Sequence, residues 1–253
     1  MNVNEEMSAF MQQHFADRLY AEGFVSYRNN MRHWYKLVDE SVLQMVILDS
    51  HRGDKKNFDF LYGAAPLYAL FPLPYAHKIE KTSYCDILSD AHYAYMWKHK
   101  DLNSYNLPLS ARFYGETLRR YTGAFEEIIW PEFHQIVNLN TCHQLWWERR
   151  QRINAVRPYY DIQRGIWELI YGHHKEELAA FITARFISDC QSWGESEHQT
   201  YLPETWRARF NVYYEYAKRI IHDSETDNWD DLDLMVQENM QQMREFVRKK
   251  LKL

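Results

Sequence analysis

The sequence predicts an α+β fold: an N-terminal helix and a three- to four-stranded antiparallel meander, followed by a multi-helix C-terminal body. Up to about residue 65 the apolar pattern is one helix followed by short alternating runs, whereas from about residue 115 it is almost entirely amphipathic helix. We therefore expect an α+β head at residues 1–100 and a helical body at residues 111–253. A polar linker that contains Pro108 is expected between them, at about residues 101–110. The alternative is that both parts pack as one unit.

The first expected element is a helix over about residues 4–22, because apolar residues recur there at three- and four-residue steps. Gly23 stands where a left-handed residue would end this helix. Short strands follow, joined by polar turns such as Asp39-Glu40-Ser41. These strands are expected at about 24–28, 34–38, 42–48 and 57–62. Their short connections favour antiparallel pairing.

The body is expected to contain helices at about 114–130, 141–153, 158–172, 175–193, 205–222 and 230–250. Thr141 and Gln144 have the spacing of a capping box, which would start the second of these helices at Thr141. Tyr159-Tyr160 with Ile166 and Tyr213-Tyr214 with Ile220 share one spacing, and each set begins a possible helix pair. This echo predicts two stacked helical hairpins.

The composition narrows the possible classes of protein. The net charge of −5 disfavours a surface devoted to nucleic acid, which must neutralise phosphates. No signal peptide is predicted, because residues 1–10 contain Glu5 and Glu6 and have no apolar core. No membrane span is predicted, because the longest charge-free run, residues 60–76, is broken by prolines and is slightly short. Three scattered cysteines are typical of reduced thiols in a cytoplasm. Aromatic residues make up 16% of the chain, and we expect most of them to fill a large core.

The head combines several features in a fixed order. They are Gly23-Phe24, the aromatic strand with Trp34-Tyr35, Gln44 among aliphatic residues, the proline-bounded loop that follows, and Lys78-Ile79-Glu80 leading to Cys85. In these features the head resembles an uncharacterised bacterial family, domain-of-unknown-function family 4304. The resemblance covers about residues 5–90 and extends faintly to 145 through Ala124-Phe125 and Pro131-Glu132-Phe133. An Arg and a Gly closely follow the cysteine in that family, whereas the nearest candidates here, Arg112 and Gly115, come after a long insertion. The family implies no known activity.

One stripe of residues could hold a metal. Cys85, His92 and His99, with Ser89 and Met96, would lie on one face if their segment were helical. Thiolate and imidazole suit zinc or copper. However, a single straight helix cannot wrap a metal, so we favour packing residues and predict no cofactor.

A second cluster mixes tryptophans and arginines. Trp146-Trp147 is followed by Arg149 and Arg152, which share a helical face and could bind phosphates and stack bases. We favour an exposed helical face on which the arginines cover the tryptophans.

Gln44 is the one polar residue in an otherwise apolar strand, so it needs a partner if it is buried. A ligand pocket between sheet and helices would be lined by Tyr35, Gln44 and Tyr62, with Arg112 supplying charge. The alternative, which we favour, is a structural hydrogen bond.

No catalytic signature is found, and whether the chain is an enzyme stays open. The first hypothesis is a non-enzymatic cytoplasmic module that binds a protein partner, as a regulator or an immunity-like protein does. The apolar loop at residues 61–74 or the Met-rich final helix would supply its surface. The second hypothesis is a small-ligand-binding protein or enzyme that uses the pocket around Gln44. The sequence does not decide the oligomeric state.

Overall fold

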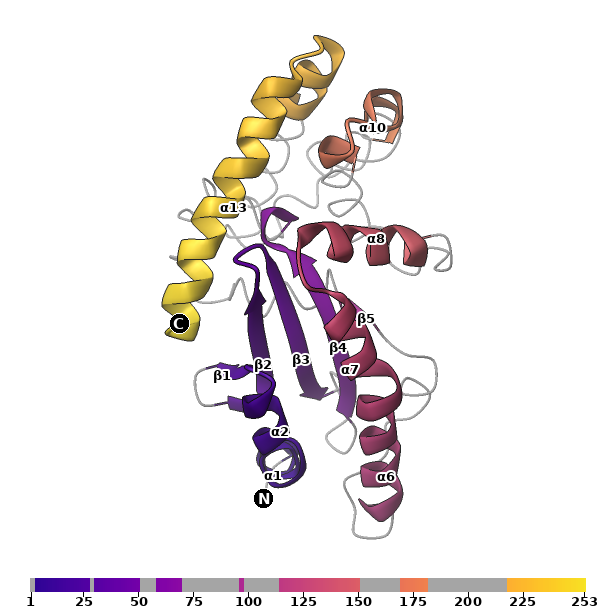
Figure 1. Cartoon of the computed structure of the whole chain (residues 1–253), viewed down its shortest axis with the longest axis vertical. Helices are drawn as coiled ribbons and strands as arrows, with labels where there is room; N and C mark the ends of the chain where they lie inside the picture. The colour runs from indigo at the N-terminus through magenta and orange to yellow at the C-terminus, as the bar shows by residue number, and fades with distance from the viewer. Residues whose placement is uncertain are drawn as a thin grey trace, which may run out of the picture. The chain divides into compact units, whose positions relative to one another are not determined.

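The computed structural model describes residues 3–27, 30–50, 58–69, 96–97, 114–150, 169–181 and 218–253 (Figure 1). The chain divides into two compact units. Unit 1 contains Met1–Leu67, Tyr95–Arg152 and Arg244–Leu253, and unit 2 contains Tyr68–Ala94 and Ile153–Met243. The expected linker at 101–110 lies outside the described residues, so the head and body boundary stays a prediction.

The N-terminal helix is confirmed, although it forms in two pieces. Helix α1 covers Val3–His14 and α2 covers Ala16–Ala21, with Phe15 between them. Gly23 ends α2 in the left-handed region, at φ 84°, as expected. Its N–H donates to the Tyr20 carbonyl, and the Phe24 N–H donates to the Leu19 carbonyl, which is the Schellman pattern.

The antiparallel meander is also confirmed. Five strands follow one another in chain order, each antiparallel to the next. They are β1 (Val25–Tyr27), β2 (Asn30–Val38), β3 (Val42–Ser50), β4 (Phe58–Pro66) and β5 (Met96–Trp97). A single 3-10 turn, η1 (Leu67–Ala69), follows β4. The sequence did not predict β5, which is too short to show a period.

The turn between β2 and β3 has two consecutive left-handed residues, Asp39 at φ 47° and Glu40 at φ 54°. The Ser41 N–H donates to the Val38 carbonyl at 3.1 Å. Positive φ at both central residues is the geometry of a type I′ turn, whose twist suits a hairpin. This turn is held from outside as well, because Arg244 Nε donates to the Glu40 carbonyl at 2.7 Å. Arg248 also pairs with the Glu40 carboxylate at 2.6 Å.

A long helical segment opens the next part of unit 1. It consists of α6 (Tyr114–Ala124), the π-helical turn η2 (Phe125–Ile129) and α7 (Trp130–Gln135). Pro131 is the second residue after the π-helical turn, and Trp130 lies between them. Proline has no N–H and clashes with the carbonyl four residues earlier, so a widened turn just before it relieves that clash.

Helix α8 (Leu139–Arg150) begins earlier than expected. Asn138, and not Thr141, is the capping residue: its side-chain oxygen accepts the Thr141 N–H at 3.0 Å. Thr141 Oγ1 accepts the Asn138 N–H in return, at 3.1 Å. The expected capping box at Thr141 was therefore placed three residues too late, because an asparagine can cap as well as a threonine.

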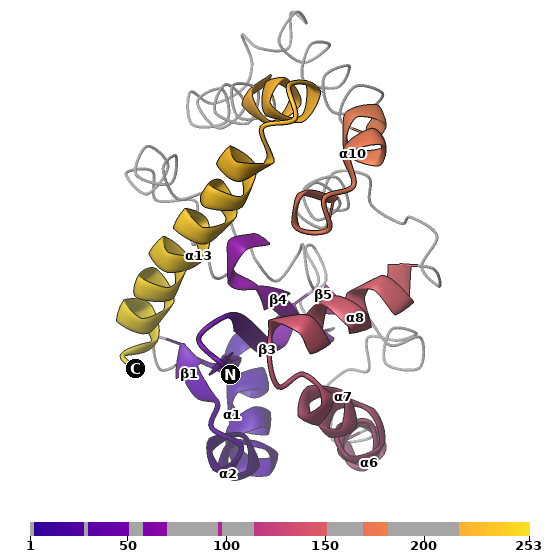
Figure 2. The same cartoon turned by 45° about the horizontal axis from the view of Figure 1, so that its top comes forward.

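The core of unit 1 is aromatic. Ring contacts run from α1 to the sheet: Phe15 stacks on Phe125 at 4.6 Å, Phe125 contacts Trp130 at 5.1 Å, and Phe133 contacts Tyr62 at 6.1 Å between ring centroids. Figure 2 shows α1, α7 and the strands within this unit. The expectation that the aromatics are structural is confirmed for the large rings that are almost fully buried. In unit 1 they are Phe10, Phe24, Trp34, Tyr35, Tyr62 and Phe125, and in unit 2 Tyr68 is buried to the same degree.

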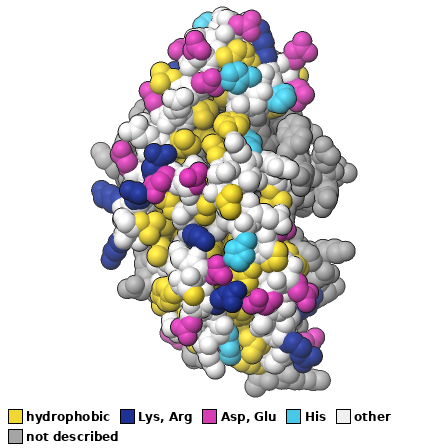
Figure 3. Space-filling model, in the orientation of Figure 1, with side chains coloured by type: hydrophobic (Ala, Val, Ile, Leu, Met, Phe, Trp, Pro, Cys, Tyr) yellow, Lys and Arg dark blue, Asp and Glu magenta, His cyan; other side chains and the backbone are white. Residues whose placement is uncertain are grey.

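The described part of unit 2 is helical. It includes α10 (Lys175–Phe181), residues 169–171 and 218–225 in helical conformation, and the first fifteen residues of α13 (Trp229–Leu251). Helix α13 buries one face, as its amphipathic pattern predicts. Acidic residues open it and basic residues close it, so both ends match the helix dipole. Figure 3 shows this separation, with acidic side chains where α13 begins, at the top, and basic ones at the left where it ends.

Candidate functional site

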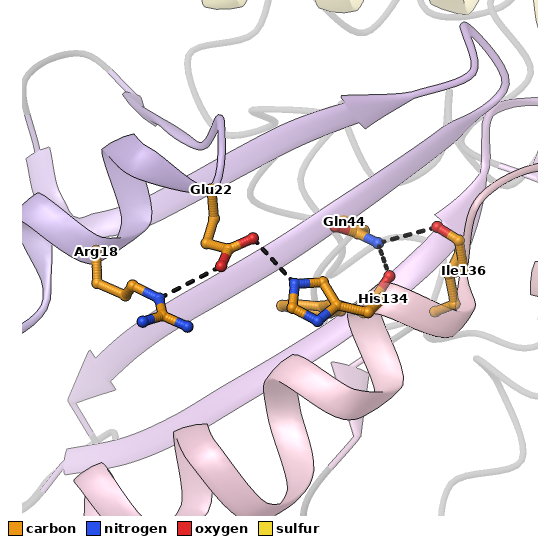
Figure 4. A network of polar contacts seen from close by, with 6 residues as sticks. Arg18, Glu22, Gln44, His134 and Ile136 are labelled. Atoms are coloured by element: carbon orange, nitrogen blue, oxygen red, sulfur yellow. Dashed lines mark hydrogen bonds and ion pairs between the residues drawn. The ribbon is translucent and has the colours of Figure 1, made fainter.

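The structure places Gln44 in the core of unit 1. The residue is 1% exposed, and its Nε2 donates to the Phe133 carbonyl at 2.9 Å and to the Ile136 carbonyl at 3.3 Å (Figure 4). Both carbonyls lie at the C-terminal end of α7, where the last turn of a helix leaves carbonyls without partners. Gln44 therefore ties the central strand to the end of a helix.

The strand register separates the residues that were expected to line a pocket. Gln44 and Val46 lie on one face of β3, and Val46 pairs with Tyr62, so Tyr62 shares that face. Tyr35 pairs with Met45 and lies on the opposite face. Tyr35 is 0% exposed and Tyr62 is 1% exposed. The fourth residue, Arg112, lies outside the described residues, and the binding role of all four stays a prediction.

A cluster of charged residues lies beside this contact. Glu22 joins the end of α2 to α7: its Oε1 lies 3.3 Å from Arg18 Nε, and its Oε2 lies 3.0 Å from His134 Nε2 (Figure 4). The His134 ring stacks over Trp130 at 6.4 Å, and the Arg18 guanidinium lies 5.6 Å from the same indole. Sequence reasoning missed this cluster, because Glu22 and His134 are 112 residues apart.

The environment of Glu22 favours its charged form. The hydrogen bond from His134 lowers the pKa of the Glu22 carboxyl, and the positive charges of Arg18 and Lys36 add to the effect. Partial burial opposes the shift but does not overcome it. A carboxylate beside an imidazole is a component of many catalytic sites, but a nucleophile must also lie within reach. Among the described residues, Glu22 is the only recorded hydrogen-bond partner of His134, so the cluster fastens α2 to α7.

A second cluster lies in unit 2, at two helix turns. The His173 ring stacks on Trp229 with centroids 5.1 Å apart and an angle of 9° between the planes. His173 Nε2 lies 3.0 Å from Asp233 Oδ1, and Lys175 forms an ion pair with Asp227. These side chains are partly exposed, and the contacts join the turn before α10 to the turn before α13.

The other expected sites are only partly described. Cys85, His92 and His99 lie outside the described residues, whereas Met96 lies in strand β5 and pairs with Gly63. The stripe is therefore not helical at Met96. Within the described ranges, no group of three His, Cys, Asp or Glu residues could hold a metal ion.

The tryptophan and arginine cluster is also incomplete. Arg149 belongs to α8, and Arg152 lies outside the described residues. The methionines of the final helix are better defined, because Met235 and Met243 are buried at 4% and 0% exposure. These two therefore fill the core instead of offering a surface.

Comparisons with protein-family models, with curated proteins and with solved structures found no match to this chain. The resemblance to family 4304 therefore stays a prediction. In the part of the chain that the structure describes, no helix has the length and apolar character needed to cross a bilayer.

Proposed function

We propose that this chain is a non-enzymatic cytoplasmic module that binds another protein. The observation that supports this proposal most is the engagement of Gln44. A ligand pocket between sheet and helices would need this side-chain amide, but the amide donates to the backbone carbonyls of Phe133 and Ile136 within the core. The neighbouring Tyr62 is 1% exposed, so the residues best placed to hold a ligand are used for packing.

Helix α2 offers a partner two suitable side chains. Tyr20 is 48% exposed, and its ring meets the buried Trp34 edge-on at 4.9 Å, which holds it in one orientation. The Arg18 side chain is 51% exposed and is oriented by Glu22. Tyr and Arg are the residues that most often anchor protein interfaces, and a side chain already held in place loses little entropy on binding.

Affinity capture with the full chain tests this proposal. We expect the wild type to retain a partner in stoichiometric amount from the native cell. Tyr20→Phe, which keeps the ring, should retain it, and Tyr20→Glu should lose it. Leu234→Glu, at a half-exposed residue of α13, is the matched control for adding a carboxylate. The purified pair should then re-form a complex in analytical ultracentrifugation. Absence of a stoichiometric partner of the wild type would contradict the proposal.

The alternative, a small-ligand-binding protein or enzyme, keeps one supporting observation. Gln44 Oε1 is buried and has no hydrogen-bond partner within the part of the chain that the structure describes. Native mass spectrometry of protein from its own cell tests this alternative. A bound small molecule that disappears in folded Gln44→Leu protein would favour it over the interaction module.

A further inference from the structure

Unit 2 contains the same helix turn twice. His173 and Asp227 are both left-handed, at φ 54° and 58°. In the first turn the His173 N–H donates to the Ile170 carbonyl at 3.0 Å, and the His174 N–H donates to the Leu169 carbonyl at 2.9 Å. The second turn has the same two bonds. There the Asp227 N–H donates to the Ser224 carbonyl at 3.5 Å and the Asn228 N–H to the Asp223 carbonyl at 2.8 Å. Both turns are Schellman motifs that lead directly into another helix.

The buried positions of the two segments match. Leu169 and Ile170 are buried before the first turn, and Leu178 is the next buried residue after it. Asp223 and Ser224 are buried before the second turn, and Leu232 is the next buried residue. Each of these three buried residues of the first segment therefore matches a buried residue 54 positions later.

The sequence keeps this offset of 54 well beyond the two turns. Tyr159-Tyr160 and Ile166 correspond to Tyr213-Tyr214 and Ile220 at the same spacing. Further pairs of the same chemical type are Asp161 and Glu215, Arg164 and Lys218, Glu176 and Asp230, Glu177 and Asp231, and Leu178 and Leu232. The matching positions lie on both sides of the two turns.

The two turns also contact each other. The His173 ring lies flat on Trp229, and its Nε2 reaches Asp233. Lys175, just after the first turn, pairs with Asp227 in the second. Figures 1 and 2 both place α10 beside the segment that precedes α13. The matching segments therefore pack turn against turn, which is how consecutive units of a helical repeat protein pack.

We infer that unit 2 contains two tandem copies of one helical hairpin, with a period of 54 residues, packed turn to turn. The inference goes beyond the proposed function and does not depend on it. A single hairpin cannot bury its apolar face alone, and a neighbouring copy covers it. The second copy differs from the first at its inward positions, where Asp223 and Ser224 replace Leu169 and Ile170. Ser224 Oγ is buried and has no hydrogen-bond partner among the described residues, and an unsatisfied buried hydroxyl costs stability.

A crystal or NMR structure of the full chain tests the repeat itself. Residues 159–178 should superpose on residues 213–232 as one helix–turn–helix segment. The repeat would be wrong if Tyr159 and Tyr213 lay at different helical positions relative to their turns.

A charge exchange tests the packing of the two turns. Lys175→Glu and Asp227→Lys should each raise the unfolding equilibrium constant by about 1.5- to 5-fold, because each places like charges together. The double variant should recover most of the loss, measured by denaturant unfolding at low salt. Lys175→Glu combined with Glu225→Lys is the matched control, and it should recover less than the exchange with Asp227. If the two single effects add up in the double variant, the turns are not packed together.

Discussion

In the part of the chain that the structure describes, the end of α2 in unit 1 and the two turns of unit 2 share both hydrogen bonds of the Schellman pattern, but they place different residues at the left-handed position. In unit 1 the left-handed residue is Gly23, which adopts φ 84° without strain. In unit 2 the equivalent residues are His173 and Asp227, which pay a steric cost for a positive φ. Their side chains then contact Trp229, Asp233 and Lys175. At these two positions the strained backbone goes with side-chain contacts between the turns. Strain is not confined to them, because Lys252 in unit 1 is also left-handed after α13, at φ 58°, where the Leu253 N–H donates to the Arg248 carbonyl.

The largest effect on stability is expected at Gly23, where α2 ends. A Cβ at residue 23 would meet only Lys36 Cε at 3.8 Å, so there is room for it and the cost is backbone strain alone. We expect Gly23→Ala to lower the free energy of unfolding by about 1–2 kcal/mol. Gly123→Ala is the control: its Cβ meets nothing within 4 Å, and alanine is the better helix former there by about 1 kcal/mol. In urea denaturation, Gly23→Ala should therefore lower the free energy of unfolding and Gly123→Ala should raise it. Equal changes in the two variants would show that Gly23 has no special role.

The second prediction distinguishes the effect of backbone strain at His173 from the effect of its side-chain contacts. His173→Ala loses the stack on Trp229 and the contact with Asp233 but keeps the left-handed strain, so it should destabilise unit 2. His173→Gly loses the same contacts and relieves the strain. We expect the glycine variant to be more stable than the alanine variant by about 1 kcal/mol in thermal or denaturant unfolding. No difference between the two would mean that residue 173 is not held at positive φ.

The third effect is smaller, because two terms oppose each other at Asp227. Asp227→Gly relieves strain of about 1 kcal/mol, but it loses a partly exposed ion pair with Lys175 that is worth less than about 1 kcal/mol. A net gain of less than about 1 kcal/mol is therefore expected. The gain should increase in 1 M salt, which screens the ion pair, and a loss that persists in salt would contradict this account of the turn.

The smallest effect concerns pH at the end of α2. The pKa of the Glu22 carboxyl is lowered in the folded chain, so the contact with His134 stabilises the fold above the unfolded pKa of Glu22. That stability is lost as the pH falls through the lower folded pKa. Because the His134 side chain is 55% exposed, the contribution should stay below about 1 kcal/mol.

Carbon-detected NMR titration of the Glu22 carboxyl measures this effect directly. His134→Asn should move the pKa of Glu22 back toward its ordinary value, and Arg18→Gln should move it less, because the hydrogen bond from His134 is the largest cause of the shift. An unchanged pKa in His134→Asn would show that another group is responsible.

These helix ends also show what the sequence could predict. Gly23 was recognisable because glycine is the usual left-handed residue after a helix. His173 and Asp227 gave no such signal, since their conformation depends on contacts with residues up to 60 positions away. The meander was predictable from alternating apolar residues and short turns. The start of α8 was misplaced because Asn138 and Thr141 can each cap a helix, and only the fold chooses between them.

The candidate sites were less predictable than the fold. Gln44 was identified as a polar residue that needs a partner, but its partners Phe133 and Ile136 lie about 90 positions away, and no local pattern connects them. The Glu22 and His134 contact was missed for the same reason. Local periodicity determines which residues form helices and strands, whereas the pairing of distant polar groups depends on how those elements pack.

The contact of α13 with the hairpin between β2 and β3 has a consequence for the order in which the chain folds. Arg244 and Glu40 are 204 positions apart, so the turn obtains this outer support only after the residues between them have been synthesised. Closing so long a loop is entropically costly and tends to come late. Until Arg244 contacts Glu40, the hairpin between β2 and β3 depends on its own backbone hydrogen bonds for its turn geometry.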